Sequence, residues 1–209
     1  SAKPEAGYTM ANYAEDAANL LDALEIETAM VLGISFGGMV GQELAIRHGA
    51  RVSRAALFCT AAGGAGGASY PLQELADLPE AERWHLSLKL NDSRIDDAYI
   101  AANPEVLEAA RQRNDLSAYE HEPNWALGRA GQLAARAEHD CWERLDQIKC
   151  PIWLAGGKYD AIATPQAMQN MASKIPDAKL DFYEGGHLFM VQDGKAFPDL
   201  IAFLKESSL

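Results

Sequence analysis

Three residues in this sequence belong to the types that perform nucleophilic catalysis: Ser35, Asp160 and His187. Ser35 lies in the glycine-rich stretch Gly33-Ile34-Ser35-Phe36-Gly37-Gly38, and the aspartate and the histidine follow it in that order. A serine hydroxyl is a poor nucleophile until an imidazole accepts its proton, and a carboxylate orients that imidazole and stabilises its positive charge. We therefore predict that Ser35 is a nucleophile, His187 its base and Asp160 the acid. The predicted chemistry is acyl transfer through an acyl-enzyme.

Each of these residues follows the end of a predicted β-strand. Residues 28–32, 150–157 and 180–183 are short, largely apolar runs, which are typical of buried parallel strands. The carboxyl ends of parallel strands lie at one edge of an open sheet, so residues far apart in the sequence can meet there. Two other aspartates compete for the role of the acid. Asp181 lies inside a predicted strand and Asp193 follows the histidine, so the aspartate named above is preferred.

The stretch around Ser35 predicts an abrupt turn from a strand into a helix. Apolar residues at helical spacing follow the turn, and Gly49 ends the predicted helix. In this setting Gly-x-Ser-x-Gly holds the serine in a strained backbone conformation, and we expect a Cβ at Gly33 or Gly37 to collide with the neighbouring strand or helix. The backbone N–H of Phe36, at the helix start, is predicted to stabilise an oxyanion. A glycine-rich turn with an incidental serine is the alternative interpretation.

Three segments together resemble the α/β-hydrolase-fold enzymes. They are Gly33-Ile34-Ser35-Phe36-Gly37-Gly38-Met39, Gly156-Gly157-Lys158-Tyr159-Asp160 and Glu184-Gly185-Gly186-His187. Within that family, the sequence resembles the 3-oxoadipate enol-lactonase-like and small carboxylesterase branch. The resemblance implies an α/β fold with a mostly parallel sheet, flanking helices and a helical cap insertion. It also implies a serine hydrolase that cleaves a small carboxylic ester or lactone, with a C–C bond hydrolase or thioesterase of the same fold as the alternative.

The sequence departs from this family ahead of the Ser35 turn. Family members normally carry several strands there, and a loop that supplies a second oxyanion donor, whereas this sequence has only an irregular segment and a helix predicted at 9–24. We therefore expect an N-terminally incomplete fold. In it, the strand at 28–32 pairs with the missing N-terminal segment or self-associates. A non-catalytic fragment or remnant that needs its missing N-terminal half is a second functional hypothesis.

The resemblance implies a core formed by residues 1–62 and 147–209, with a cap at 63–146. This middle part has no strand signals, and its mixed apolar and charged faces predict helices at 75–90, 96–102, 104–113 and 124–137. Caps shape the mouth of a site and exclude water from it. Trp84 and Trp125 are therefore candidate substrate contacts, although packing is the more common role of an aromatic residue on an amphipathic helix.

The composition narrows the classes of partner and compartment. The chain has 209 residues, of which 48% are hydrophobic, a formal net charge of −12 and a pI near 4.8. One sizeable core is expected, and the acidic balance argues against nucleic acids and anionic membranes as partners. Three dispersed cysteines predict no disulfide framework, and hence a cytoplasmic protein. No apolar run approaches membrane-spanning length.

No cofactor or metal is predicted. The sequence has no Gly-x-Gly-x-x-Gly after a strand. His85, His121 and His139 lack metal-ligand spacing and are expected to be surface or capping residues. Residues 61–69 are nearly all small, but they lack the Gly-Lys-Ser/Thr ending of a phosphate-binding loop, so we expect a flexible hinge there.

Overall fold

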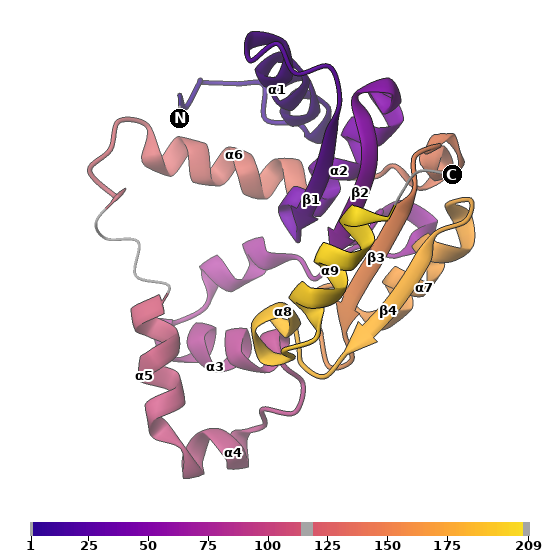
Figure 1. Ribbon diagram of the computed structural model, residues 1–209. Coiled ribbons are helices and arrows are strands. Elements are labelled where there is room, and N and C mark those ends of the chain that lie inside the picture. Colours follow the sequence, from indigo (N-terminus) through magenta and orange to yellow (C-terminus); the bar gives the residue numbers. More distant parts are fainter. Residues whose placement is uncertain (1, 114–118, 207–209) are drawn as a thin grey trace.

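A computed structural model describes residues 2–113 and 119–206. Its sheet has four parallel strands in the order β1-β2-β3-β4, so each strand lies beside its neighbour in sequence (Figure 1). The strands are β1 (Ala29–Ile34), β2 (Val52–Phe58), β3 (Ile152–Gly157) and β4 (Lys179–Tyr183). The three strands predicted at 28–32, 150–157 and 180–183 are present as β1, β3 and β4, with boundaries that differ by one or two residues. No helix in the part of the chain described here is long and apolar enough to cross a membrane.

The helices cover the two faces of the sheet unequally. Consecutive right-handed crossovers that move in one direction place their helices on the same face. That face is covered by α1 (Met10–Ala23), α2 (Phe36–Arg47) and α7 (Pro165–Lys174). The other face is covered by α8 (Phe189–Gln192) and α9 (Ala196–Lys205), which follow the last strand (Figure 1). The sheet thereby becomes the middle of three layers.

The central strands are buried on both faces because their apolar side chains point alternately to each layer. Leu57 and Leu154 lie opposite one another and pack toward α1, α2 and α7. Phe58 and Trp153 pack toward α8 and α9, with ring centroids 5.3 Å apart at nearly right angles. Because these strands are buried on both faces, their carboxyl ends are held in place, and the predicted catalytic residues follow strand ends of this sheet.

Strand β1 is an edge strand within the described residues, and the prediction that it is buried is wrong for one of its faces. Met30, Leu32 and Ile34 are exposed by 60%, 41% and 39%, whereas Val31 packs into the core on the other face. No helix among the described residues covers the first face. Leu24, the last residue of the helix predicted at 9–24, lies beyond the end of α1 and is 58% exposed.

Two helices of the core begin at a threonine cap. The hydroxyl of Thr9 accepts a hydrogen bond from the N–H of Asn12 at the start of α1. Thr164 does the same for Ala167 at the start of α7, with Pro165 in the first helical position. These caps satisfy N–H groups that have no partner within their own helix.

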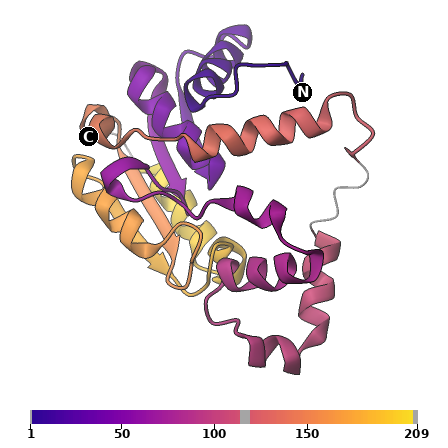
Figure 2. The same ribbon diagram turned by 180° about the vertical axis from the view of Figure 1, so that it is seen from behind.

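The segment 63–146, the predicted cap, contains no strand among its described residues. It has the 3₁₀ helix η3 (Leu72–Asp77) and the helices α3 (Glu80–Asn91), α4 (Asp97–Ala102), α5 (Pro104–Arg113) and α6 (Trp125–Ala137). The helix predicted at 75–90 is therefore interrupted, because Pro79 begins a new helix. Figures 1 and 2 show α3, α4 and α5 gathered together and α6 apart from them, nearer α1. Leu88, Ile100 and Ala110 form a small apolar cluster between the first three.

The small-residue stretch 61–69 is not a flexible hinge. Ala61 and Ala62 are completely buried, and a Cβ at Gly63 would lie 1.9 Å from the carbonyl oxygen of His139. Gly63 has a φ of +76°, which favours glycine, and a Cβ at Gly66 would meet the Trp142 ring at 2.2 Å. The small residues are present because the two ends of the predicted cap approach each other closely here.

A buried carboxylate joins α2 to the 3₁₀ helix η5 (Trp142–Gln147). Glu43 is 3% exposed and accepts hydrogen bonds from Arg47 Nε at 2.7 Å, Arg144 Nη1 at 2.8 Å and Arg144 Nη2. Burial raises the pKa of this carboxyl, but the hydrogen bonds from Arg144 and Arg47 outweigh it, so the pKa lies below its ordinary value of 4.5.

Replacing this carboxylate should cost stability in a pH-dependent way. The folded-state pKa is depressed, so the stabilisation is complete above 4.5 and is lost as the pH falls through the lower folded value. We expect Glu43→Gln to lower the free energy of unfolding by about 2 kcal/mol at neutral pH, since both arginines are partly exposed and regain water. In urea titrations this loss should shrink at acidic pH. The control is Glu143→Gln, which removes an exposed glutamate that pairs with Lys174 and should change the free energy of unfolding by nearly nothing. An equal loss at both pH values would contradict the assignment.

Candidate active site

The backbone at Ser35 has a conformation that few non-glycine residues adopt. Its φ is +54° and its ψ is −113°, between the end of β1 and the first residue of α2. A Cβ at Gly33 would lie 2.4 Å from the carbonyl oxygen of Gly37, so the expected collision is confirmed there. It is wrong for Gly37, where an added Cβ meets nothing within 4 Å. The second tight position is instead Gly38, whose Cβ would lie 2.6 Å from that of Thr60.

The three predicted catalytic side chains meet. His187 Nε2 lies 2.9 Å from Ser35 Oγ, and His187 Nδ1 lies 2.8 Å from Asp160 Oδ2. Asp160 is 3% exposed and His187 9%, whereas Ser35 is half-buried. One imidazole thus touches a hydroxyl on one side and a carboxylate on the other, which is the geometry that lets it take a proton from the serine.

The Asp160 carboxylate is held by its own loop. Its Oδ1 accepts hydrogen bonds from the backbone N–H groups of Ile162 at 2.8 Å and Ala163 at 2.9 Å. This leaves Oδ2 for the imidazole. The two competing aspartates have other partners, since Asp181 accepts from Trp153 Nε1 at 2.9 Å and Asp193 accepts from backbone N–H groups at 3.0 Å. Of these three aspartates, only Asp160 contacts His187.

Phe36 is the first residue of α2, directly after Ser35. The carbonyl oxygen of Ser35 accepts from Gly38 N at 2.9 Å and from Met39 N at 3.3 Å. The N–H of Phe36 belongs to the first turn, in which an N–H has no acceptor within its own helix. Its position therefore suits the predicted role, because the helix start favours negative charge.

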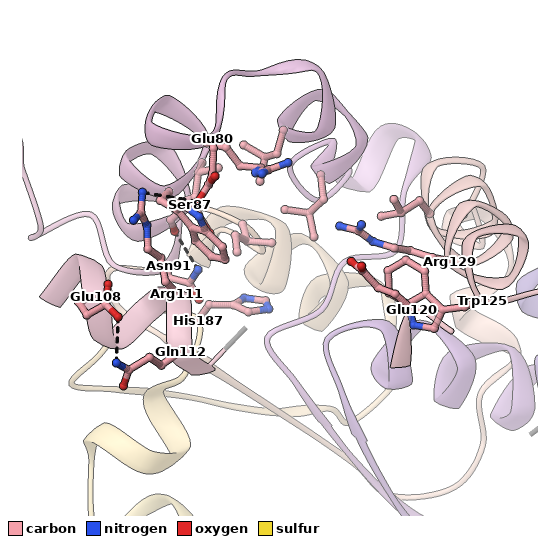
Figure 3. A pocket seen from close by; sticks show the side chains of 17 residues that line it. Glu80, Ser87, Asn91, Glu108, Arg111, Gln112, Glu120, Trp125, Arg129 and His187 are labelled. Carbon is pink, nitrogen blue, oxygen red and sulfur yellow. Dashed lines mark hydrogen bonds and ion pairs between the residues drawn. The ribbon is translucent and has the colours of Figure 1, made fainter. Parts of the chain in front are cut away.

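A cavity of about 880 Å³ lies between the predicted cap and the His187 loop. Trp84 of α3 and Trp125 of α6, the two tryptophans singled out in the sequence, both contribute to its wall, as does His187. Figure 3 shows the His187 ring between two groups of side chains, with Asn91 and Arg111 in one and Trp125 in the other. The cavity has the size and the mixed polar and apolar lining of a small-molecule site.

Sequence reasoning missed the charged residues of this cavity. Arg83, Arg111 and Arg129 all line it. Arg111 pairs with Glu80 at 3.5 Å, and the Arg129 guanidinium lies 5.4 Å from the centre of the Trp125 ring (Figure 3). They are on helical faces that read as solvated in the sequence, so no local signal distinguishes them from surface arginines.

Residues 2–113 and 119–206 contain no cluster of three or more histidine, cysteine, aspartate or glutamate side chains that could hold a metal ion.

One of the histidines expected at the surface is in fact buried. His139 is 7% exposed, and burial lowers its pKa to about 4. Its Nε2 lies 3.7 Å from Cys141 Sγ, and neither ring nitrogen contacts His187 or Ser35.

Known proteins resemble this chain along nearly its whole length. It is 28% identical to 3-oxoadipate enol-lactonase 2 of Acinetobacter baylyi, over 94% of this chain and 71% of that protein. It is 30% identical to 2-hydroxymuconate semialdehyde hydrolase of Pseudomonas putida, over 99% of this chain and 73% of that protein. Among solved structures, the enol-lactonase of Burkholderia xenovorans LB400 superposes with a TM-score of 0.74 at 24% identity, covering 99% of this chain and 76% of that one.

The family model for the alpha/beta hydrolase fold matches residues 1–193. This match includes the Ser35 turn, the Asp160 loop and His187. The predicted fold class is confirmed by it and by the superposition, and the relatives are hydrolases. The chain is a hydrolase and belongs to the α/β-hydrolase family.

Proposed function

We propose that this protein cleaves a small carboxylic ester or lactone through an acyl-enzyme on Ser35. The observation that carries the proposal is the unbroken contact from Ser35 Oγ through the His187 imidazole to the Asp160 carboxylate. The name of the Acinetobacter relative supports a lactone as one substrate class. The cavity beside His187 has the volume for a molecule of that size.

The proposed reaction begins when Ser35 Oγ attacks the carbonyl carbon of the ester. His187 Nε2 takes the hydroxyl proton, and Asp160 stabilises the resulting imidazolium. The negative charge on the carbonyl oxygen is stabilised by the Phe36 N–H at the start of α2. When the C–O bond to the leaving alkoxide breaks, His187 returns the proton to it. Water then attacks the acyl-enzyme by the same route, releases the acid and restores Ser35.

A C–C bond hydrolase is the second candidate, because the Pseudomonas putida relative carries the name 2-hydroxymuconate semialdehyde hydrolase. Both candidates use attack at a carbonyl carbon, but they differ in the bond that breaks. The contacts around Ser35 are the same for either one, whereas the cavity wall, including Trp84 and Trp125, would select between them. Measuring which substrates the protein turns over therefore distinguishes the two candidates.

The test is a comparison of three substrates with the purified protein. A small aryl ester and a small aliphatic lactone are followed by acid release, and 2-hydroxymuconate semialdehyde by chromatographic loss of the substrate. We expect turnover of the ester and the lactone. Turnover of the semialdehyde alone would replace this proposal with the second candidate, and turnover of none would refute hydrolysis of all three substrate classes.

A further inference from the structure

The end of α3 in the predicted cap contacts both loops that carry the triad. We call residues 157–163 the acid loop and residues 184–188 the base loop. The carbonyl oxygen of Asn91, the last residue of α3, accepts a hydrogen bond of 2.6 Å from the N–H of His187. The preceding carbonyl, of Leu90, accepts one of 3.1 Å from Ala161 in the acid loop. The backbone at this point therefore sets the position of both loops.

A hydrogen-bond network of polar side chains reinforces the contact to the base loop. Asp92 is 3% exposed and accepts hydrogen bonds from Arg94 Nε at 2.9 Å and Nη2 at 2.6 Å. Its Oδ2 also accepts one of 3.2 Å from Gln192 Nε2, and the Oε1 of the same glutamine accepts one of 2.8 Å from the N–H of Gly186. This network thus links the end of α3 to the N–H of Gly186, the residue immediately before His187.

The Asp92 carboxyl is ionised, so it can accept the hydrogen bonds from both Arg94 and Gln192. Burial raises its pKa, but hydrogen bonds from Arg94 and Gln192 hold the pKa below its ordinary value. The Arg94 guanidinium also lies over the ring of Tyr159, 4.4 Å from its centre, beside the acid loop's aspartate. An ionised Asp92 accepts on both sides and fixes the orientation of the Gln192 amide, whose carbonyl must face Gly186.

The base loop has little room to adjust. A Cβ at Gly186 would lie 1.8 Å from the carbonyl oxygen of Asn91. Gly185 has a φ of +146°, and a Cβ there would lie 2.5 Å from Gln192 Oε1. Two consecutive glycines therefore let the loop press against α3 and against the glutamine amide, so a change in either surface is transmitted to His187.

We propose that Asp92 and Gln192 are positioning residues that aim the His187 imidazole. The proposal rests on the proposed function, because the aim matters only if His187 takes a proton from Ser35. A misplacement of about 1 Å in a catalytic group costs about 10²-fold in rate. The structure also admits a purely architectural role, in which these bonds only hold α3 against the core. A positioning role predicts that loss of Gln192 lowers kcat and changes the tautomer of the His187 imidazole, whereas an architectural role predicts neither change.

The experiment uses Gln192→Ala, because Gln192 is an exposed residue whose loss leaves the core intact. We expect kcat for a small aryl ester to fall about 10-fold to 100-fold with KM unchanged and thermal unfolding unaltered. The matched control is Gln166→Ala, an exposed glutamine of α7 that bonds Asn170 at 2.9 Å, and it should keep wild-type kcat. Asp92→Asn places a donor opposite Gln192, and adding Gln192→Ala to it should cost no more than the larger single change.

Ring-nitrogen chemical shifts of ¹⁵N-labelled histidine provide a second measurement, with the His187 signal assigned by its absence in His187→Ala. Wild-type protein should show one tautomer with the proton on Nδ1, and Gln192→Ala should show a mixture. Unchanged kcat and shifts in Gln192→Ala would overturn the proposal. If the wild type hydrolyses nothing, the proposed function fails, and the shifts alone then decide whether these residues position His187.

Discussion

The Ser35→Ala variant is expected to lose nearly all hydrolytic activity, with kcat falling by a factor on the order of 10⁶, as in serine proteases that lose their nucleophile. The hydroxyl that contacts His187 Nε2 at 2.9 Å is the only atom lost. The measurement is kcat for a small ester together with a thermal unfolding curve. Ser173→Ala removes an exposed hydroxyl that donates to the Asn170 carbonyl oxygen at 2.7 Å; it is the matched control and should keep full activity.

His187→Ala should cost about as much as Ser35→Ala, and the double variant should cost little more, because the two groups act as a unit. Additive losses would mean that the imidazole does not activate the serine. Appreciable turnover in Ser35→Ala would show that another group, or a water molecule activated directly by His187, attacks the substrate.

The Asp160→Asn variant is expected to lower kcat by about 10⁴, again by analogy with the serine proteases. The asparagine can still accept the hydrogen bonds from Ile162 and Ala163 through its oxygen, so its amide nitrogen faces His187 Nδ1. That nitrogen donates a hydrogen bond, so it favours the tautomer with the imidazole proton on Nε2, which cannot accept a proton from the serine.

Two matched controls distinguish this effect from a general loss of an aspartate. Asp181→Asn and Asp193→Asn remove the competing carboxylates, neither of which contacts His187. Both should retain activity within a few-fold of the wild type. A loss in either that matched Asp160→Asn would reassign the acid, and an active Asp160→Asn would remove the aspartate from the mechanism.

The core of the site could be predicted from the sequence because its signals are local. Ser35 lies between an apolar run and a helical pattern, and the aspartate and the histidine each follow an apolar run after glycines. Such runs become parallel strands whose carboxyl ends meet, so three local signals were enough to place Ser35, Asp160 and His187 together.

What the sequence did not predict depends on contacts between distant segments. Gly38 is needed because Thr60 approaches it, and Gly37, which fits the motif equally well, has open space instead. Asp92 and Gln192 are 100 positions apart and read as surface polar residues until α3 is placed against the base loop. The burial of His139 and the packing of residues 61–69 likewise depend on how the two ends of the predicted cap meet.

Covalent labelling tests the central claim, that Ser35 is a nucleophile activated by His187, most directly. The purified protein is incubated with a fluorophosphonate, its intact mass is measured, and the modified peptide is sequenced by fragmentation. We predict one adduct per chain, located on Ser35, which forms far more slowly in His187→Ala and not at all in Ser35→Ala. An unmodified Ser35 in the wild type, or an adduct on another residue of the cavity such as Ser87, would contradict the account.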